Sequence, residues 1–361
     1  MNLRTPGPTP LPPDVREALG HEMVDHRGAD FAAVFDEVTA NLRDLYRTRD
    51  DVLIFTGSGT GGLEAAIANL FSPGEQVLVI SIGFFGDRFD QIARAFGLET
   101  VKLGFEMGEA ADPAVVARAL DEHPDVTSVL VTHNETSTGT TNDLRAIARV
   151  VKAAGKLLVV DGISSIGSIP LETDDWDCDV VISGSQKSWM ISPGLAFVSV
   201  GPRAWEAHAR SRMPRFYWDF SHARQWAEKS TTPWTPAVSL FFGLQVALRL
   251  MQQEGLNAVL ARHARLGAFV RGELKSMGLT LLVKDEARAS DTVTAFWLPE
   301  GVEAPPLQRR LREEHGVNLA GGQGVLSGKV LRIGHLGYVH EQELAEALGA
   351  LRAVLTLAPA A

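Results

Sequence analysis

The sequence predicts an α/β fold, in which a large domain with a mostly parallel sheet is followed by a smaller C-terminal α+β domain. Short runs of valine, isoleucine and leucine alternate with helical patterns through the first two-thirds of the 361 residues. Such runs are typical of parallel strands that helices cover on both faces. After Pro236 long helical patterns dominate instead. We therefore expect an N-terminal arm at residues 1–13, a large domain at 14–254 and a small domain at 255–361.

The arm is predicted from its prolines. Residues 5–13 hold five prolines and a glycine. Proline has no backbone N–H and can donate neither to a helix nor to a strand ladder. We therefore expect this segment to be extended.

The large domain begins with helical spacing at residues 31–46 and an apolar run at 51–55. A glycine-rich turn at 57–62 then leads into a helical stretch at 63–70. Further strands are predicted from aliphatic runs at 76–82, 126–132, 157–160 and 180–182. Helical patterns separate several of these strands, at 89–96 and 144–154. Ligands of such sheets bind at the carboxyl ends of the strands.

The last third of the chain has a different pattern, with long helices and fewer strands. Residues 238–253 and 256–277 have the spacing of long amphipathic helices. Short strands are predicted at 292–297 and 330–333, and a final helix at 341–355.

Composition excludes several classes of function. The chain has 34 basic and 44 acidic residues, a net charge of −10, which disfavours binding to nucleic acid or anionic membranes. Cys178 is the single cysteine, so a disulfide framework and a thiolate metal cage are excluded, and the histidines show no metal spacing. No apolar run approaches the roughly 18 residues of a membrane span, and no signal peptide pattern is present. We expect a cytoplasmic protein without a metal site.

The glycine-rich turn, GSGTGG at residues 57–62, lies between a predicted strand and a predicted helix. Glycines let an anion approach the backbone, and the helix N-terminus offers free N–H groups. A dinucleotide site would need an acidic residue at the end of the next strand, which instead ends in Ser-Ile-Gly at 81–83. No Gly-Lys-Ser/Thr motif follows either. The turn therefore favours a single phosphate and disfavours a nicotinamide cofactor, although a plain tight turn remains an alternative.

Two charged residues follow predicted buried strands. Asp161 comes directly after four aliphatic residues, and Lys187 follows the next strand within small and apolar neighbours. Alone, each has an ordinary interpretation, a turn aspartate and a surface lysine. Together with the phosphate turn they match pyridoxal 5'-phosphate, which needs a helix N-terminus for its phosphate, a carboxylate for its ring nitrogen and a lysine for its aldehyde.

The sequence resembles the class V, fold-type I aminotransferases, particularly the alanine–glyoxylate and serine–pyruvate group. The resemblance runs in order over nearly the whole chain, and the aspartate and lysine motifs are its most specific part. The matching segments are TPGPT at 5–9, GSGT and LEAA within 57–66, GFFGDR at 83–88, HNETSTG at 133–139, DGISS at 161–165, SGSQK at 183–187 and GKVLRIG at 328–334.

This resemblance implies roles for individual residues. Lys187 would be the Schiff-base lysine that carries the proton, and Asp161 would pair with the ring nitrogen. Arg332 would bind the substrate α-carboxylate, and Gly7 belongs to the segment that lines the substrate site. The other implied cofactor contacts are Ser58, Gly59, Thr60 and Gln186 to phosphate, Thr136 to the ring hydroxyl, and Phe85 and Ile163 to the ring faces. Phe85 stands where animal members have tryptophan.

The resemblance also implies a homodimer whose active site lies between subunits. The segment that reaches the partner's phosphate reads TTPWTP at residues 231–236. We choose Thr235 for this contact and Thr232 as the second choice. Arg27 is a further candidate for the substrate site.

The implied activity is a ping-pong transamination from a small amino acid, alanine or serine, to a small 2-oxo acid, glyoxylate or pyruvate. Aspartate, ureidoglycine or pyridoxamine are alternative donors. A lyase of the same fold, similar to cysteine desulfurases, is the next alternative. It is disfavoured because Gln186 stands where those enzymes typically have histidine and because Cys178 lies outside the C-terminal half. A partner-binding protein without activity is the third alternative.

Overall fold

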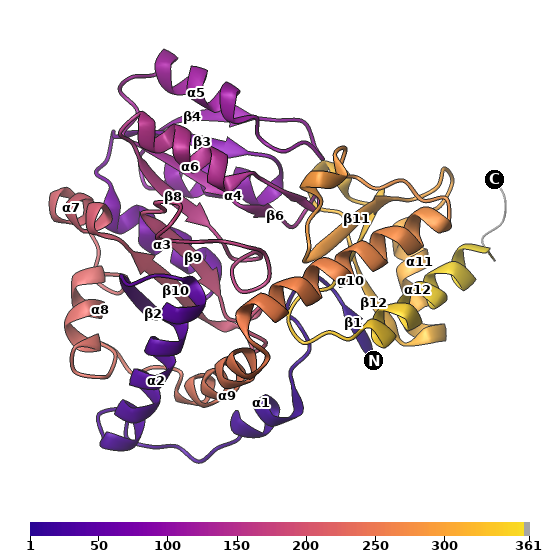
Figure 1. The fold of residues 1–361 in the computed structure, drawn as a ribbon, viewed down its shortest axis with the longest axis horizontal. Coiled ribbons are helices and arrows are strands. Elements are labelled where there is room, and N and C mark those ends of the chain that lie inside the picture. The colour runs from indigo at the N-terminus through magenta and orange to yellow at the C-terminus, as the bar shows by residue number, and fades with distance from the viewer. Residues whose placement is uncertain (357–361) are drawn as a thin grey trace.

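The protein is described from a computed structural model, which covers residues 1–356. Two β-sheets organise the chain, and Figure 1 shows them in a larger and a smaller part that lie side by side. The N-terminus and the last helix both belong to the smaller part (Figure 1).

The larger sheet has seven strands in the order β2-β10-β9-β8-β5-β3-β4. All neighbouring strands are parallel except at β10, which is antiparallel to both β2 and β9. The predicted fold class, with a mostly parallel sheet, is therefore confirmed. The strands are β2 (Asp51–Gly57), β3 (Gln76–Ser81), β4 (Glu99–Gly104), β5 (Ser128–Thr132), β8 (Leu157–Asp161), β9 (Val180–Gly184) and β10 (Gly194–Val200).

Helices cover both faces of this sheet. Along β3, Val77 and Val79 join one hydrophobic cluster, whereas Leu78 and Ile80 join another on the opposite face. This alternation follows from the two-residue period of a strand and explains why the strand is apolar throughout. The helices of this part are α1 (Pro13–Ala18), α2 (Ala29–Tyr46), α3 (Gly59–Leu70), α4 (Phe84–Ala95), α5 (Pro113–Glu122), α6 (Leu144–Ala153), α7 (Pro202–Arg210), α8 (Phe220–Ala227) and α9 (Val238–Glu254).

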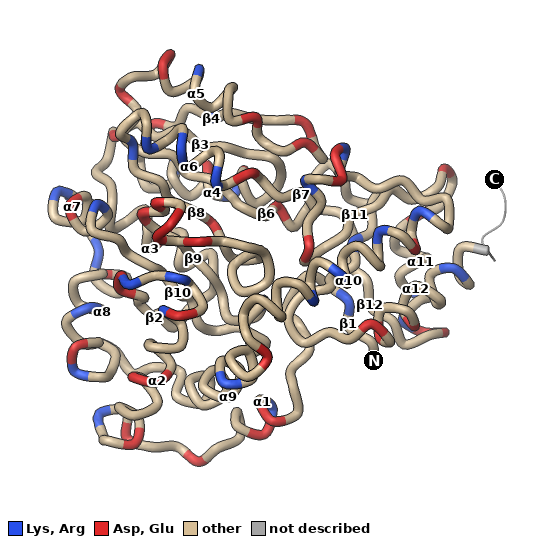
Figure 2. Tube along the Cα trace, in the orientation of Figure 1, with Lys and Arg blue, Asp and Glu red and all other residues tan. Residues whose placement is uncertain are grey.

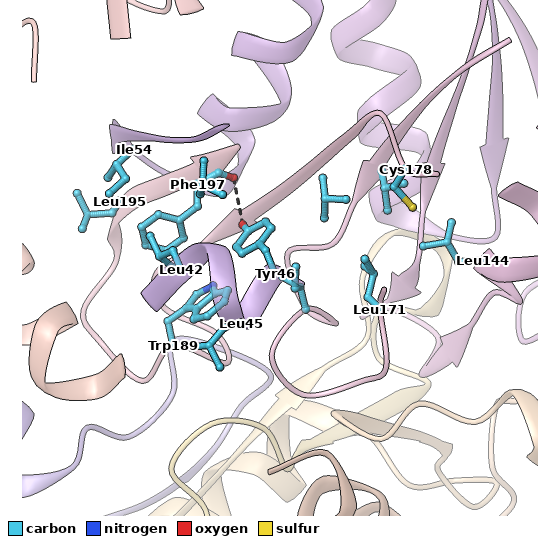
Figure 3. Packing of buried hydrophobic residues seen from close by; sticks show 14 of the residues in the cluster. Leu42, Leu45, Tyr46, Ile54, Leu144, Leu171, Cys178, Trp189, Leu195 and Phe197 are labelled. Carbon is cyan, nitrogen blue, oxygen red and sulfur yellow. Dashed lines mark hydrogen bonds between the residues drawn. The ribbon is translucent and has the colours of Figure 1, made fainter. Parts of the chain in front are cut away.

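An aromatic cluster packs against the turn that joins β9 to β10, and Trp189 of this turn belongs to it (Figure 3). The rings of Tyr46 and Trp189 stack with centroids 5.6 Å apart, and the Tyr46 hydroxyl donates to the Phe197 carbonyl at 3.4 Å. The Trp189 indole N–H donates to the Ser183 hydroxyl at 2.8 Å. Since these side chains are buried and paired, they give the turn that carries Lys187 a closely packed base.

The smaller sheet has the order β1-β12-β13-β11. Its first strand comes from the N-terminal arm and pairs in parallel with β12, Asn2 opposite Val317. Its strands are β1 (Asn2–Arg4), β11 (Val293–Trp297), β12 (Val317–Gly321) and β13 (Val330–Gly334), its helices α10 (Leu256–Ser276), α11 (Ala304–His315) and α12 (Glu341–Thr356). The strands β6 (Asn134–Glu135) and β7 (Thr140–Thr141) form a separate hairpin, and 3₁₀ turns lie at Glu286–Arg288 and Gly324–Leu326.

Several elements differ from the sequence-based expectation. The sequence did not predict the following elements: β1, β4, β6, β7, β10, β12, α1, α5, α7, α8 and α11. Helix α4 begins at Phe84 rather than at 89, so most of the GFFGDR segment at 83–88 forms the start of this helix. The predicted division at residue 255 stays a prediction: α10 to α12 and β11 to β13 follow it, but β1 of the same sheet precedes it.

Within residues 1–356, none of the helices combines the length and the apolar character that crossing a bilayer requires. Figure 2 shows basic and acidic residues intermixed along residues 1–356 in both parts.

Candidate active site

One cavity gathers nine of the predicted site residues at the carboxyl end of the large sheet. These nine are Ser58, Gly59, Thr60, Phe85, Thr136, Asp161, Ile163, Gln186 and Lys187. Four further residues complete the lining, Leu63, Arg88, Asn134 and Ser164. The cavity lies where the α/β rule places ligands, since β5, β8 and β9 all end beside it.

The N-terminus of α3 forms one wall of the cavity. Ser58 is its N-cap, and the Ser58 hydroxyl accepts from the Gly61 amide at 3.3 Å. A β-carbon on Gly59 would lie 2.6 Å from Ile163 Cδ1, so the close packing there requires glycine. The side chain of Gln186 adds an oxygen, Oε1, that is buried without a hydrogen-bond partner within residues 1–356. The helix N-terminus makes this wall suited to an anion, and the Gln186 amide adds a donor there only if it is turned so that Nε2 takes the place of this oxygen.

Asp161 is the last residue of β8 and is buried. Its carboxylate accepts from the Ile163 amide at 3.0 Å and from the Thr132 hydroxyl at 3.3 Å. Burial raises the pKa of Asp161 to about 6, and the negative charge of Glu135 adds to this shift, while the two hydrogen bonds and Lys187 oppose it. A cation bound against this carboxylate would favour its charged form.

Lys187 follows β9 and reaches back to the N-terminal arm. Its Nζ donates to the Pro6 carbonyl at 2.5 Å. A β-carbon on Gly7 would lie 2.7 Å from Nζ, so the arm leaves room for the lysine only because this residue is glycine. Burial lowers the pKa of Lys187 to about 8, the positive charges of Arg332 and Arg88 lower it too, and Asp161 opposes them. The amine is thus partly neutral near pH 8, the form that acts as nucleophile or base.

Hydroxyls and an amide form the wall opposite α3. The Thr136 hydroxyl donates to the Ser164 hydroxyl at 2.9 Å, and Asn134 Nδ2 donates to the same oxygen at 2.8 Å. Asn134 Nδ2 also donates to the hydroxyl of Thr292 at 3.0 Å, from the segment that leads into β11. This network fixes the Thr136 hydroxyl at the wall of the cavity.

Arg332 lies on β13 of the smaller sheet, bonded to Thr136 of the cavity wall but not itself among the residues that line the cavity. Its Nε donates to the Gly321 carbonyl at 2.9 Å, and its Nη1 donates to the Thr136 carbonyl at 3.0 Å and to Gln323 Oε1 at 3.1 Å. Burial lowers the pKa of Arg332 to about 10, and Glu135 opposes this shift. Nη2 makes no hydrogen bond within residues 1–356, so the guanidinium is fixed in place with donors to spare.

Glu135 is a buried carboxylate that the sequence analysis did not select. Its Oε2 accepts from the amides of Phe85 and Gly86 at 3.0 and 3.1 Å, and its Oε1 accepts from the amide and hydroxyl of Ser137 at 3.0 and 2.6 Å. It thereby caps the N-terminus of α4, whose N-cap residue Gly83 has no side chain. The acid inside the HNETSTG segment was visible, but the two α4 amides that it accepts from lie about fifty residues away.

The predicted partner-subunit segment lies outside this cavity. Thr235 and Thr232 line a separate, small pocket that also includes Tyr217. The guanidinium of Arg27 donates to the carbonyls of Thr232 and Pro233, at 2.6 and 3.1 Å. Arg27 therefore holds this segment and does not line the cavity within its own chain.

Known proteins resemble this chain over most of its length. The model of the family Aminotransferase class-V matches residues 6–348. A protein of Synechococcus sp. described as the small subunit of a soluble hydrogenase is 45% identical and covers 98% of this chain and 92% of its own. The L-aspartate–glyoxylate aminotransferase of Paracoccus denitrificans is 36% identical and covers 92% of this chain and 85% of its own.

Solved structures agree with this assignment. The crystal structure of an alanine–glyoxylate aminotransferase from Nostoc sp. superposes with a TM-score of 0.94 at 32% identity, covering 98% of this chain and 94% of that chain. Both the sequence match and the fold extend over the cavity and its walls. The chain belongs to the class-V aminotransferases.

Proposed function

We propose that this enzyme binds pyridoxal 5'-phosphate and transfers an amino group from a small amino acid, alanine or serine, to a small 2-oxo acid such as glyoxylate or pyruvate. One observation carries the proposal. The α3 N-terminus, the Asp161 carboxylate and the Lys187 amine, which lie far apart in the sequence, line a single cavity. They supply the three contacts that this cofactor requires. The names of the relatives support the same class of reaction.

The residues present fit the cofactor. Ser58, Gly59, Thr60 and Gln186 would hold the phosphate, and the unpartnered oxygen of Gln186 shows that this wall has unused hydrogen-bonding capacity. Gln186 can turn its amide to present the two N–H donors of Nε2 in place of that oxygen. Thr136 would hold the ring hydroxyl, Phe85 and Ile163 the ring faces. When bound, the cofactor supplies an aldehyde that condenses with amines and a ring that accepts electrons.

The chain's own groups then have distinct tasks. Lys187 Nζ, neutral in part near pH 8, takes a proton from the α-carbon of the amino acid and later returns one. Asp161 supplies the negative charge that keeps a ring nitrogen protonated. Arg332 is held by three acceptors through Nε and Nη1, and its Nη2 is available to bind the α-carboxylate of the substrate.

We further propose a homodimer in which Thr235, or Thr232 as the second choice, contacts the phosphate held by the partner. Two aromatic side chains near this segment are exposed, Phe216 at 67% and Tyr217 at 43%. Phe216 packs on Trp234 with ring centroids 4.8 Å apart. Clustered exposed aromatic residues are typical of a surface that a partner covers.

The alternatives have less support. A desulfurase would need a reactive cysteine, but burial raises the pKa of Cys178 well above its usual value and packs this thiol in the core. The hydrogenase description belongs to the Synechococcus relative. The single cysteine of this chain gives it no residue-level support, since iron–sulfur clusters are held by several thiolates.

A half-reaction screen tests the proposed function. The purified protein is loaded with pyridoxal 5'-phosphate and mixed in turn with alanine, serine, aspartate and glycine, while the visible absorbance of the cofactor is followed. We expect this absorbance to fall with at least one donor and to return when glyoxylate or pyruvate is added. The Lys187→Ala variant should show neither change.

Borohydride reduction followed by peptide mapping provides the control, because it should label Lys187 and no other lysine. An unlabelled Lys187, or full turnover by Lys187→Ala, would refute the assignment.

A further inference from the structure

Arg88 is a cation inside the cavity that none of the roles above uses. It lies one turn into α4 and lines the same cavity as Lys187 and Asp161. Its guanidinium carbon stands 4.9 Å from the ring centroid of Phe85 and 5.1 Å from that of Phe84. Both rings contact the guanidinium by cation–π interaction, which does not use its N–H groups as hydrogen-bond donors.

The acids near Arg88 are committed to other partners. Its chain neighbour Asp87 pairs with Lys102 Nζ at 2.7 Å and accepts from the Ser81 hydroxyl at 2.5 Å. Glu135 is occupied by backbone amides and by Ser137. Within residues 1–356, Arg88 itself makes no hydrogen bond or ion pair.

The charge of Arg88 acts at the reacting centre. It is one of the groups that lower the pKa of Lys187, together with burial and Arg332. A half-buried guanidinium that has no acid partner and faces a cavity is a site for an anionic group of the ligand.

The other anions of the reaction already have a place. The proposed function assigns the cofactor phosphate to the N-terminus of α3 and the α-carboxylate to Arg332. We propose that Arg88 binds the second carboxylate of a dicarboxylic substrate, so that a short dicarboxylic amino acid such as aspartate is a preferred donor over alanine or serine. This inference rests on the proposed transamination and revises its donor: in place of alanine or serine it takes aspartate, one of the alternative donors of the sequence analysis.

The test compares donors in one enzyme and in matched variants. Wild type, Arg88→Gln, Arg88→Lys and the control Arg118→Gln, at an exposed position of α5, are loaded with cofactor. The kcat/KM of the half-reaction is then measured with aspartate and with alanine. Loss of a charge-assisted hydrogen bond corresponds to about a 10- to 100-fold decrease, which we expect for aspartate in Arg88→Gln.

For alanine the same variant should lose no more than about threefold, because the missing contact is one that alanine does not make. Arg88→Lys should fall between wild type and Arg88→Gln for aspartate, since lysine keeps the charge without the planar fork of donors. Arg118→Gln should match wild type with both donors.

A binding measurement without turnover accompanies the kinetics. Succinate has two carboxylates and no amino group, and propionate is the matched ligand with one. Succinate should raise the melting temperature of the loaded wild type at lower concentration than propionate does, and Arg88→Gln should remove this difference.

Equal losses with aspartate and alanine in Arg88→Gln would overturn the proposal, because they would show that the arginine only supports the two phenylalanine rings. An unchanged aspartate-to-alanine ratio, or equal binding of succinate and propionate to wild type, would overturn it as well. If the wild type converts none of the four donors, the proposed function fails. The succinate comparison then still decides whether Arg88 binds a second carboxylate.

Discussion

At the scale of single residues, the charge state of Lys187 follows from its surroundings. Burial lowers its pKa to about 8, Arg332 and Arg88 act in the same direction, and Asp161 opposes them. We therefore expect the ¹³Cε signal of Lys187 in the cofactor-free protein to titrate near pH 8, with the neutral amine predominating above that pH. A free lysine titrates near 10.4. Asp161→Asn should move the midpoint to lower pH, because it removes the one charge that favours the protonated amine.

The Lys187→Met variant identifies the signal. Between about pH 8 and 10.5, Lys187 is protonated in the unfolded chain but has lost its proton in the folded chain. The free energy of unfolding therefore rises with pH across this window, as far as Lys187 contributes to it. A midpoint of 10 or above in the folded protein would contradict the burial described here.

At the scale of elements, the start of α4 depends on one carboxylate from another segment. Glu135→Gln replaces an acceptor oxygen by an amide NH₂, which cannot accept from the N–H groups of Phe85 and Gly86. Leaving such donors unpaired costs about 1–3 kcal/mol, which denaturant unfolding should detect. Because Phe85 shifts with the turn, the visible circular dichroism of the bound cofactor should change too.

The matched control is Glu122→Gln, at an exposed position near the end of α5. It should change neither the unfolding free energy nor the dichroism. A Glu135→Gln protein that behaves like this control would show that the α4 turn holds its conformation without the carboxylate.

Local patterns predicted the elements that carry the chemistry. Aliphatic runs identified β8 and β9, and because parallel strands end at one edge of a sheet, Asp161 and Lys187 could be expected together. The glycines of 57–62 likewise identified the start of α3. The antiparallel direction of β10 could not be predicted, since hydrophobic periodicity is the same in both directions.

Contacts between segments that are distant in the sequence could not be predicted from local sequence patterns. Glu135 meets the amide of Phe85 across fifty residues, and both residues were inside quoted motifs without any sign that they touch. Arg88 was likewise visible in GFFGDR, but only the structure shows that its neighbour Asp87 is paired with Lys102. Three-residue strands such as β1 are too short for any periodicity to predict.

At the scale of the whole molecule, the N-terminal arm connects the smaller sheet to the active site. Its strand β1 pairs with β12, and Nη1 of the buried Arg4 lies 3.5 Å from Oε2 of Glu343. Further along the arm, the carbonyl of Pro6 accepts a hydrogen bond from Nζ of Lys187. We expect deletion of residues 2–4 to lower the melting temperature by at least about 2 °C, since about 1 kcal/mol shifts it by 2–4 °C in proteins of moderate size. The affinity for the cofactor should fall as well, because the arm no longer fixes Lys187.

The control is Arg16→Gln, an exposed position of α1 beyond the deleted segment. Differential scanning calorimetry and a cofactor titration provide the two measurements. If the deletion variant keeps both the wild-type melting temperature and its cofactor affinity, the arm has no part in holding the site together.

The pairing of β1 with β12 also sets an order for the completion of the molecule. During translation Asn2 is made long before its neighbour in the sheet, Val317. The nascent β1 segment therefore has no β-sheet neighbour while the seven-stranded sheet can already assemble. Lys187 is thus made long before β12, the strand that anchors its arm, and the catalytic pocket is completed only after β12 has been synthesised.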